Sequence, residues 1–214
     1  MCRISLKYIL LDGILMAEAI PMIPTFGNAK FITVDRLKEL GFSHYKISRL
    51  VASGSLKPSN RSTYENLSYD GDENDFYSAA AFVPYGVICL MSAARYYQLT
   101  DFLPDAVQVA INRKKKVSTL PTWPEIKLFY FSPVRLELGV QEIHEGDNAF
   151  RIYNLEKTVA DIISYRNKVR IEETAAILRN FLRRKDCDLN RLHDYAKQLR
   201  CEKPRRNYLE VLIQ

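Results

Sequence analysis

The chain of 214 residues lacks the short motifs that mark the common catalytic classes. It contains no glycine-rich phosphate loop, no HExxH, no GxSxG and no protein-kinase signature set. Its three histidines, His44, His144 and His193, lie in different segments, so no catalytic triad is indicated. We therefore expect no catalytic residues, no cofactor and no bound metal.

Cysteine is scarce, and the four cysteines are scattered: Cys2, Cys89, Cys187 and Cys201. No pair has CxxC spacing and no histidine stands at ligand spacing, which argues against a zinc site and against a redox pair. Reduced thiols are typical of the cytosol, so we expect a cytoplasmic protein.

Long apolar runs are also missing. Residues 1–21 resemble a signal peptide only superficially, because Asp12 and Glu18 interrupt the apolar stretch. A secretory core needs about 7 to 15 uncharged residues and a membrane span about 20. We therefore interpret this segment as a first amphipathic helix and expect no association with a membrane.

The composition is that of an ordinary globular protein, but the charge is unevenly distributed. Hydrophobic residues make up 47% and charged residues 26% of the chain, and the net charge is +6. Residues 30–62 carry seven basic and two acidic side chains, whereas residues 63–105 carry seven acidic side chains and one arginine. A basic module beside an acidic one is typical of a protein whose small module faces phosphate, although ordinary surface variation gives the same pattern.

Residues 31–54 have the pattern of two short helices. Thr33 is a suitable N-cap for a first helix of about eight residues that ends at Gly41. Ser43 is a suitable N-cap for a second helix, in which apolar residues recur at i, i+3 and i+4 from Ile47. Two short helices around a glycine-containing turn are the helix-turn-helix pattern.

The segments Ser55–Pro58 and Ser62–Tyr64 flank a polar turn and predict the two strands of a wing. A recognition helix enters the major groove with its N-terminal residues first, and wing cations contact backbone phosphate. The predicted DNA-binding residues are Ser43, His44, Tyr45, Lys46 and Arg49 on the second helix and Lys57 and Arg61 on the wing. Winged helices also serve as protein-interaction modules, and that alternative stays open.

The acidic run Asp70–Asp75 is a suitable domain boundary. It would separate a winged helix-turn-helix domain over residues 1–68, which includes the leading helix, from a second domain over residues 76–214. In the second domain we expect a buried helix over about 87–97 and strands over 106–111, 125–131, 140–145 and 149–153. The basic run 113–116 would lie in a hairpin-like loop, as a solvated turn or as a phosphate contact.

From Asn154 onward the apolar period becomes helical. We expect helices beginning at Asn154, over 171–182, over 189–199 and over 208–213. The basic residues on their outer faces are a candidate surface for RNA or for an acidic partner, or else they solvate and cap the helices. These residues are Lys168, Arg170, Arg179, Arg183 and Arg184.

One weak motif points to an enzyme. Pro104-Asp105 followed by Glu125-Ile126-Lys127 matches the letters of the PD-(D/E)xK nuclease signature. In that signature two carboxylates hold a divalent metal, and a lysine on the same strand face positions the attacking water. Two short sequence motifs separated by a gap of variable length also match by chance.

The order of these segments resembles that of the AbiEi antitoxins of bacterial type IV toxin–antitoxin systems. The resemblance covers residues 30 to 200, and its most specific parts are "CLMSAARYYQLT" and "RIYNLEKTVADII". It implies a cytoplasmic repressor that binds inverted repeats near its own promoter. It also implies a C-terminal domain that counteracts a nucleotidyltransferase toxin without a stable complex, and the basic tail residues are then the candidate antitoxin surface.

We therefore predict an α+β protein with an N-terminal winged helix-turn-helix and a mixed α/β domain that ends in a helical tail. Its predicted role is a non-enzymatic, DNA-binding antitoxin that represses its own promoter. A winged-helix nuclease and a protein-interaction adaptor are the alternatives. A monomer and a homodimer are both compatible with these residues.

Overall fold

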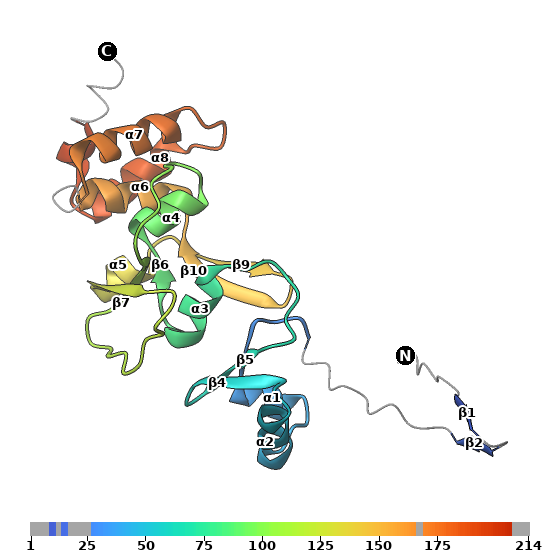
Figure 1. Ribbon diagram of the computed structural model, residues 1–214. Helices are drawn as coiled ribbons and strands as arrows, with labels where there is room; N and C mark the ends of the chain where they lie inside the picture. Colours follow the sequence, from blue (N-terminus) through green and yellow to red (C-terminus); the bar gives the residue numbers. More distant parts are fainter. Residues whose placement is uncertain (1–8, 12–13, 17–26, 166–168, 207–214) are drawn as a thin grey trace.

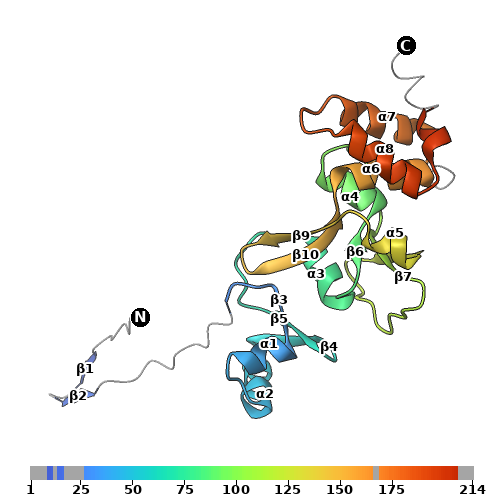
Figure 2. The same cartoon turned by 180° about the vertical axis from the view of Figure 1, so that it is seen from behind.

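Figure 1 shows the computed structural model, which describes residues 9–11, 14–16, 27–165 and 169–206. The fold is mixed α+β, as the sequence predicts. In both views the helices α1 and α2 lie at the opposite end of the molecule from the helices of the C-terminal third, and the largest sheet lies between them (Figures 1 and 2).

Residues 31–66 form a small unit of two helices and one antiparallel sheet. The helices are α1 (Val34–Glu39) and α2 (His44–Ala52), and the sheet has the order β3 (Phe31–Thr33), β5 (Thr63–Asn66), β4 (Leu56–Asn60). The side chains of Thr33 and Ser43 accept the N-cap hydrogen bonds, as predicted. The core of the unit consists of Ile32, Leu37, Ile47 and Leu56.

Most of the described chain after residue 66 is built around a five-stranded sheet. Its strands, in spatial order, are β8 (Ile126–Phe131), β7 (Val107–Asn112), β6 (Val87–Ile88), β10 (Asn148–Tyr153) and β9 (Val140–Glu145). The predicted strands over 140–145 and 149–153 are confirmed as β9 and β10, which pair antiparallel with Asn148 opposite Glu145.

Helices cover both faces of this sheet. The helix α3 (Asp75–Phe82) packs on the face that carries Val109, Phe150 and Ile152. Residues of the other face belong to a core that also contains residues of one earlier helix and of helices of the C-terminal third. These are α4 (Leu90–Tyr96), α6 (Leu155–Ser164), α7 (Ile171–Leu182) and α8 (Leu189–Gln198), while the short α5 (Pro133–Glu137) follows β8.

The leading amphipathic helix is not what the structure shows. Residues Ile9–Leu11 (β1) and Ile14–Met16 (β2) form an antiparallel strand pair instead. The sequence between them is Asp12-Gly13, and Asp-Gly between two short apolar runs is among the strongest local signals for a β-hairpin. The interpretation of this segment as an amphipathic helix did not take this turn signal into account.

Two further boundaries differ from the prediction. The helix expected over 87–97 begins only at Leu90, because Val87 and Ile88 form β6, which joins β7 to β10. The acidic run Asp70–Asp75 ends in α3, a helix that the sequence analysis did not predict. Asn74 caps this helix by accepting a hydrogen bond from the Phe76 amide.

The strands β7 and β8 are parallel, with Val107 opposite Ile126, so the expected hairpin-like loop between them is wrong. Parallel strands need a crossover of about a dozen residues, and residues 113–125 supply that length. The helix α7 has the predicted bounds, and the predicted N-cap at Asn154 is confirmed. The predicted helix over 208–213 lies outside the described residues.

Candidate nucleic-acid interface

The helix α2 presents its polar residues to solvent. Ile47 is buried in the small unit, whereas Tyr45 is 71% exposed. All five residues predicted to bind DNA on this helix are exposed: Ser43, His44, Tyr45, Lys46 and Arg49. Lys46 and Arg49 form no ion pair within the described chain, and α2 contains no acidic residue. Their charges are therefore free to meet phosphate.

The two wing cations differ from each other. Lys57 is exposed on β4, and its Nζ lies 3.7 Å from Glu65 Oε2. Arg61 lies at the turn between β4 and β5 and has no carboxylate partner among the described residues. The Asn60 Oδ1 accepts hydrogen bonds from the Ser62 amide and hydroxyl, which shapes the turn and leaves Arg61 at its tip.

Acidic residues neutralise a third cation at the base of the wing. The Lys30 Nζ lies 2.7 Å from Glu73 Oε1 and 3.5 Å from Glu65 Oε1. Burial lowers the pKa of Lys30, but the hydrogen bond and charge of Glu73, with Glu65, raise it above its usual value overall. Lys30 is therefore already paired, in contrast to the cations of α2 and to Arg61 at the wing tip.

A cavity of about 540 Å³ opens beside the wing tip. Its walls come from the β4–β5 turn, the end of α3, the loop after β7, α5 and β10. Four of its lining residues are basic: Arg61, Lys115, Lys116 and Arg151. The structure thus brings half of the predicted basic run 113–116 next to the predicted wing, although the two are far apart in sequence.

The basic residues of the tail do not form one uniform surface. Arg179 and Arg183 are exposed on α7 and at its C-cap, and Arg170 is exposed at the N-cap. The Arg184 guanidinium is engaged, because it donates to both carboxylate oxygens of Asp186 and to the Tyr97 carbonyl. Lys168 lies outside the described residues.

The residues of the nuclease-like motif line one cavity of about 830 Å³. Glu125 directly precedes β8, and Lys127 projects from the same face of that strand. Asp105 lies just before β7, so the parallel pairing brings it to the same edge. The described residues contain no group of three His, Cys, Asp or Glu side chains that could hold a metal ion.

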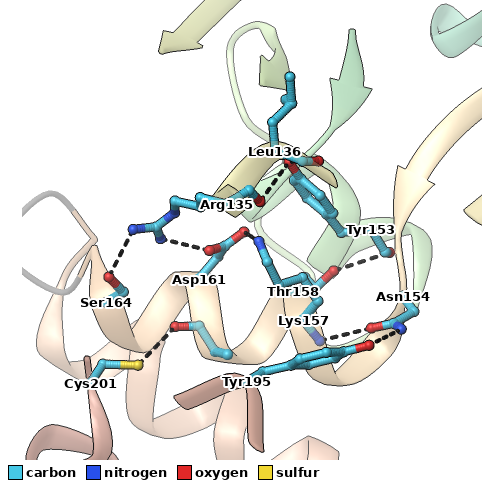
Figure 3. Close-up of polar contacts among 11 residues, drawn as sticks. Arg135, Leu136, Tyr153, Asn154, Lys157, Thr158, Asp161, Ser164, Tyr195 and Cys201 are labelled. Carbon is cyan, nitrogen blue, oxygen red and sulfur yellow. Dashed lines mark hydrogen bonds and ion pairs between the residues drawn. The ribbon is translucent and has the colours of Figure 1, made fainter. Parts of the chain in front are cut away.

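Figure 3 shows a buried ion network that the sequence analysis did not predict. The side chains of Lys157 and Asp161 are fully buried and form an ion pair one turn apart on α6. Arg135 Nη2 donates to the other oxygen of Asp161 at 2.6 Å, and Nη1 donates to Ser164 Oγ at 3.2 Å. The spacing i, i+4 of Lys157 and Asp161 was the available signal.

Aromatic rings complete the surroundings of this network. The Lys157 Nζ lies 3.9 Å from the centroid of the Tyr153 ring, and the Arg135 guanidinium lies 4.6 Å from that of Phe131. Burial lowers the pKa of Lys157, and the charge of Asp161 opposes this effect. The cluster holds α5 and α6 together in the interior, so we assign it to the stability of the fold.

Comparison with known proteins adds no family assignment: no model of a protein family matches this chain, and no curated protein matches it significantly. Among the helices that the structure describes, none has the length and apolar character needed to cross a bilayer.

Proposed function

We propose that this protein binds double-stranded DNA, with residues 31–66 acting as a winged helix-turn-helix. The observation that supports this best is the surface of α2, where Lys46 and Arg49 are exposed, lack carboxylate partners and lie beside the exposed Tyr45. In this arrangement α2 is the recognition helix, and the turn that carries Arg61 is the tip of the wing. Phosphate contacts supply affinity, and side chains at the start of α2 contact base edges.

We further propose that the protein represses its own promoter and counteracts a nucleotidyltransferase toxin. This part rests on the resemblance to the AbiEi antitoxins. The exposed cations Arg170, Arg179 and Arg183 are the candidate antitoxin surface, and Arg184 is removed from it because its guanidinium is engaged within the protein. A nucleotidyltransferase reading frame next to this gene would favour this proposal over the nuclease and adaptor alternatives.

Fluorescence anisotropy with a duplex from the region upstream of the gene tests the DNA-binding proposal. Affinity should fall steeply with salt, because each neutralised phosphate contributes about 0.9 to the slope of log K against log salt. Lys46→Ala should reduce the steepness of this salt dependence by about 0.9, which is the contribution of one phosphate contact. Arg49→Ala should cost about 1 to 3 kcal/mol if it contacts a base, and should weaken all sequences equally if it contacts only phosphate.

A matched control separates these contacts from net charge. Lys197 is exposed on α8, so Lys197→Ala removes the same charge far from α2 in the sequence and at the opposite end of the molecule (Figure 1). It should leave the affinity and the salt slope unchanged. Binding that does not depend on salt, or equal effects of Lys46→Ala and Lys197→Ala, would contradict the proposed interface.

A further inference from the structure

The cavity beside the wing tip has the charge of an anion-binding site. Its lining includes four cations and one carboxylate, Glu137. None of Arg61, Lys115, Lys116 and Arg151 forms an ion pair with another described residue. Four unpaired cations around one hollow repel one another, and a bound anion relieves that repulsion.

The same cavity has an aromatic and apolar wall. Tyr85 lines it and is 68% exposed, and the Lys115 Nζ lies 5.0 Å from the centroid of its ring. Phe82, Val83 and Val117 add apolar surface beside the tyrosine. An exposed aromatic ring next to cations is the combination that stacks a nucleobase while phosphate meets the charges.

The size of the cavity narrows the choice of ligand. Pockets for small ligands span about 300 to 1,000 Å³, and this cavity measures about 540 Å³. That volume is larger than a single inorganic phosphate requires, and it is large enough for a mononucleotide. Asn60, Asn112, Ser118 and Thr119 supply neutral hydrogen-bonding groups around it.

We propose that this cavity binds a free nucleoside phosphate. In this arrangement Tyr85 stacks on the base, and Lys115, Lys116 and Arg151 hold the phosphates. Arg61 belongs to the cavity and also to the proposed wing, so a bound nucleotide competes with DNA phosphate for the same guanidinium. Nucleotide binding would then weaken operator binding, and by reciprocity operator DNA would weaken nucleotide binding by the same factor.

Calorimetric titration of the full-length protein with ATP, in the absence of DNA, tests this proposal separately from DNA binding. Lys115→Gln and Lys116→Gln should each raise the Kd for ATP about tenfold, because each removes a charge-assisted contact. Tyr85→Ala should also raise it. Arg113→Gln and Lys114→Gln are matched controls, since both residues belong to the same basic run but do not line the cavity. These two should change the Kd less than twofold.

Three outcomes would overturn the proposal. Equal effects of the control and cavity variants would show diffuse charge attraction, and inorganic phosphate binding as tightly as ATP would show that Tyr85 has no part. If ATP does not bind, while Lys115→Gln and Lys116→Gln weaken binding of the upstream duplex, the cavity cations contact DNA backbone instead. Circular dichroism spectra that match the wild type ensure that each variant is folded.

Discussion

At the scale of single residues, Lys157 and Asp161 on α6 are the most completely buried charged side chains of the described chain. Removing Lys157 and Asp161 from water is costly, and the fold offsets this cost with a direct ion pair, the Arg135 guanidinium and aromatic ring faces. The balance depends on all partners being present. Loss of Asp161 removes the carboxylate that compensates the buried charge of Lys157.

We predict that Asp161→Asn lowers the free energy of unfolding by about 3 to 5 kcal/mol, because it leaves the buried Lys157 and the half-buried Arg135 without their carboxylate. Urea denaturation followed by circular dichroism measures this. Asp186→Asn is the matched control, since Asp186 pairs with Arg184 at an exposed site. It should change the midpoint little, and similar midpoints for the two variants would show that the buried pair is not important for stability.

A second prediction concerns Cys89, which is fully buried. Burial, followed by the charge of Asp161, raises the pKa of this thiol well above its usual value. In the unfolded chain the thiol ionises near pH 9, whereas in the folded protein it stays protonated, so its stabilising effect is complete below pH 9 and is lost as the pH rises.

Cys89→Ala should therefore reduce the loss of stability between pH 8 and pH 10 by about 1 kcal/mol. Urea midpoints at the two pH values, for wild type and variant, give this difference. The half-buried Cys187 provides the control variant Cys187→Ala. An unchanged pH dependence in Cys89→Ala would rule out ionisation of this thiol as a cause of alkaline unfolding.

At the scale of elements, N-cap residues and apolar periodicity predicted the helices and strands that such neighbouring residues determine. The bounds of α7 follow from its apolar period, and α2 follows from Ser43 and from the Ile47 face. The predicted DNA-binding residues are exposed because the same period that buries Ile47 directs them outward. This exposure supports the predicted interface but does not test it.

Pairing between distant segments was not predictable from such patterns. Periodicity identifies β7 and β8 as strands but does not specify their partners, so the parallel register remained hidden. The two-residue strand β6 exists because β7 and β10 lie on either side of it, and no local signal separates it from α4. The cavity beside Arg61 was not predictable for the same reason, since its walls come from five separate segments.

Charge reversal at the end of α7 tests the proposed antitoxin surface. We predict that Arg179→Glu with Arg183→Glu keeps the fold, because both residues are exposed, and abolishes rescue of cells from the nucleotidyltransferase toxin. Rescue assays together with circular dichroism measure both effects. A folded double variant that still rescues cells would show that these arginines only solvate the helix. Arg184 is unsuitable for this test, since its reversal removes the bond to the Tyr97 carbonyl and disturbs the fold.

The nuclease alternative is tested at the edge of β8. We predict that the purified protein does not nick plasmid DNA in the presence of Mg²⁺ or Mn²⁺. If Asp105, Glu125 and Lys127 formed a metal-dependent site, cleavage would occur and would disappear in Glu125→Gln. Agarose gels distinguish the two results, and nicking that Glu125→Gln abolishes would replace our assignment with that of an enzyme.

At the scale of the whole molecule, the segment that joins the two halves is more structured than a linker. The Tyr69 hydroxyl donates to the Asp72 carbonyl at 2.8 Å and accepts from Asn148 at 3.3 Å, so the acidic run is held against β10. The small unit is attached as well, because Asn60 Nδ2 donates to the Ala81 carbonyl at 3.2 Å and the Lys30 amide to Asn148 Oδ1 at 2.7 Å. Any fragment that begins after Asp72 loses these contacts, so the contacts of α3 decide where it can begin.

The structure therefore determines where a fragment that tests the proposed antitoxin role can begin. A fragment that starts at Ala79 cuts through α3 and removes Phe76 and Tyr77, whose rings pack near Phe150. A fragment that starts at Glu73 keeps both rings, the Asn74 cap and the hydrogen bond from Tyr77 to Glu145.

We predict that the fragment 73–214 folds, loses promoter binding and retains rescue from the toxin. The fragment 79–214 should be less stable by about 3 to 5 kcal/mol or more, because loss of one buried aromatic side chain alone costs this amount. Urea midpoints, promoter-binding assays and rescue assays on both fragments measure these differences. Equal stability of the two would show that α3 is dispensable for the sheet, and promoter binding by 73–214 would place the DNA-binding surface outside residues 31–66.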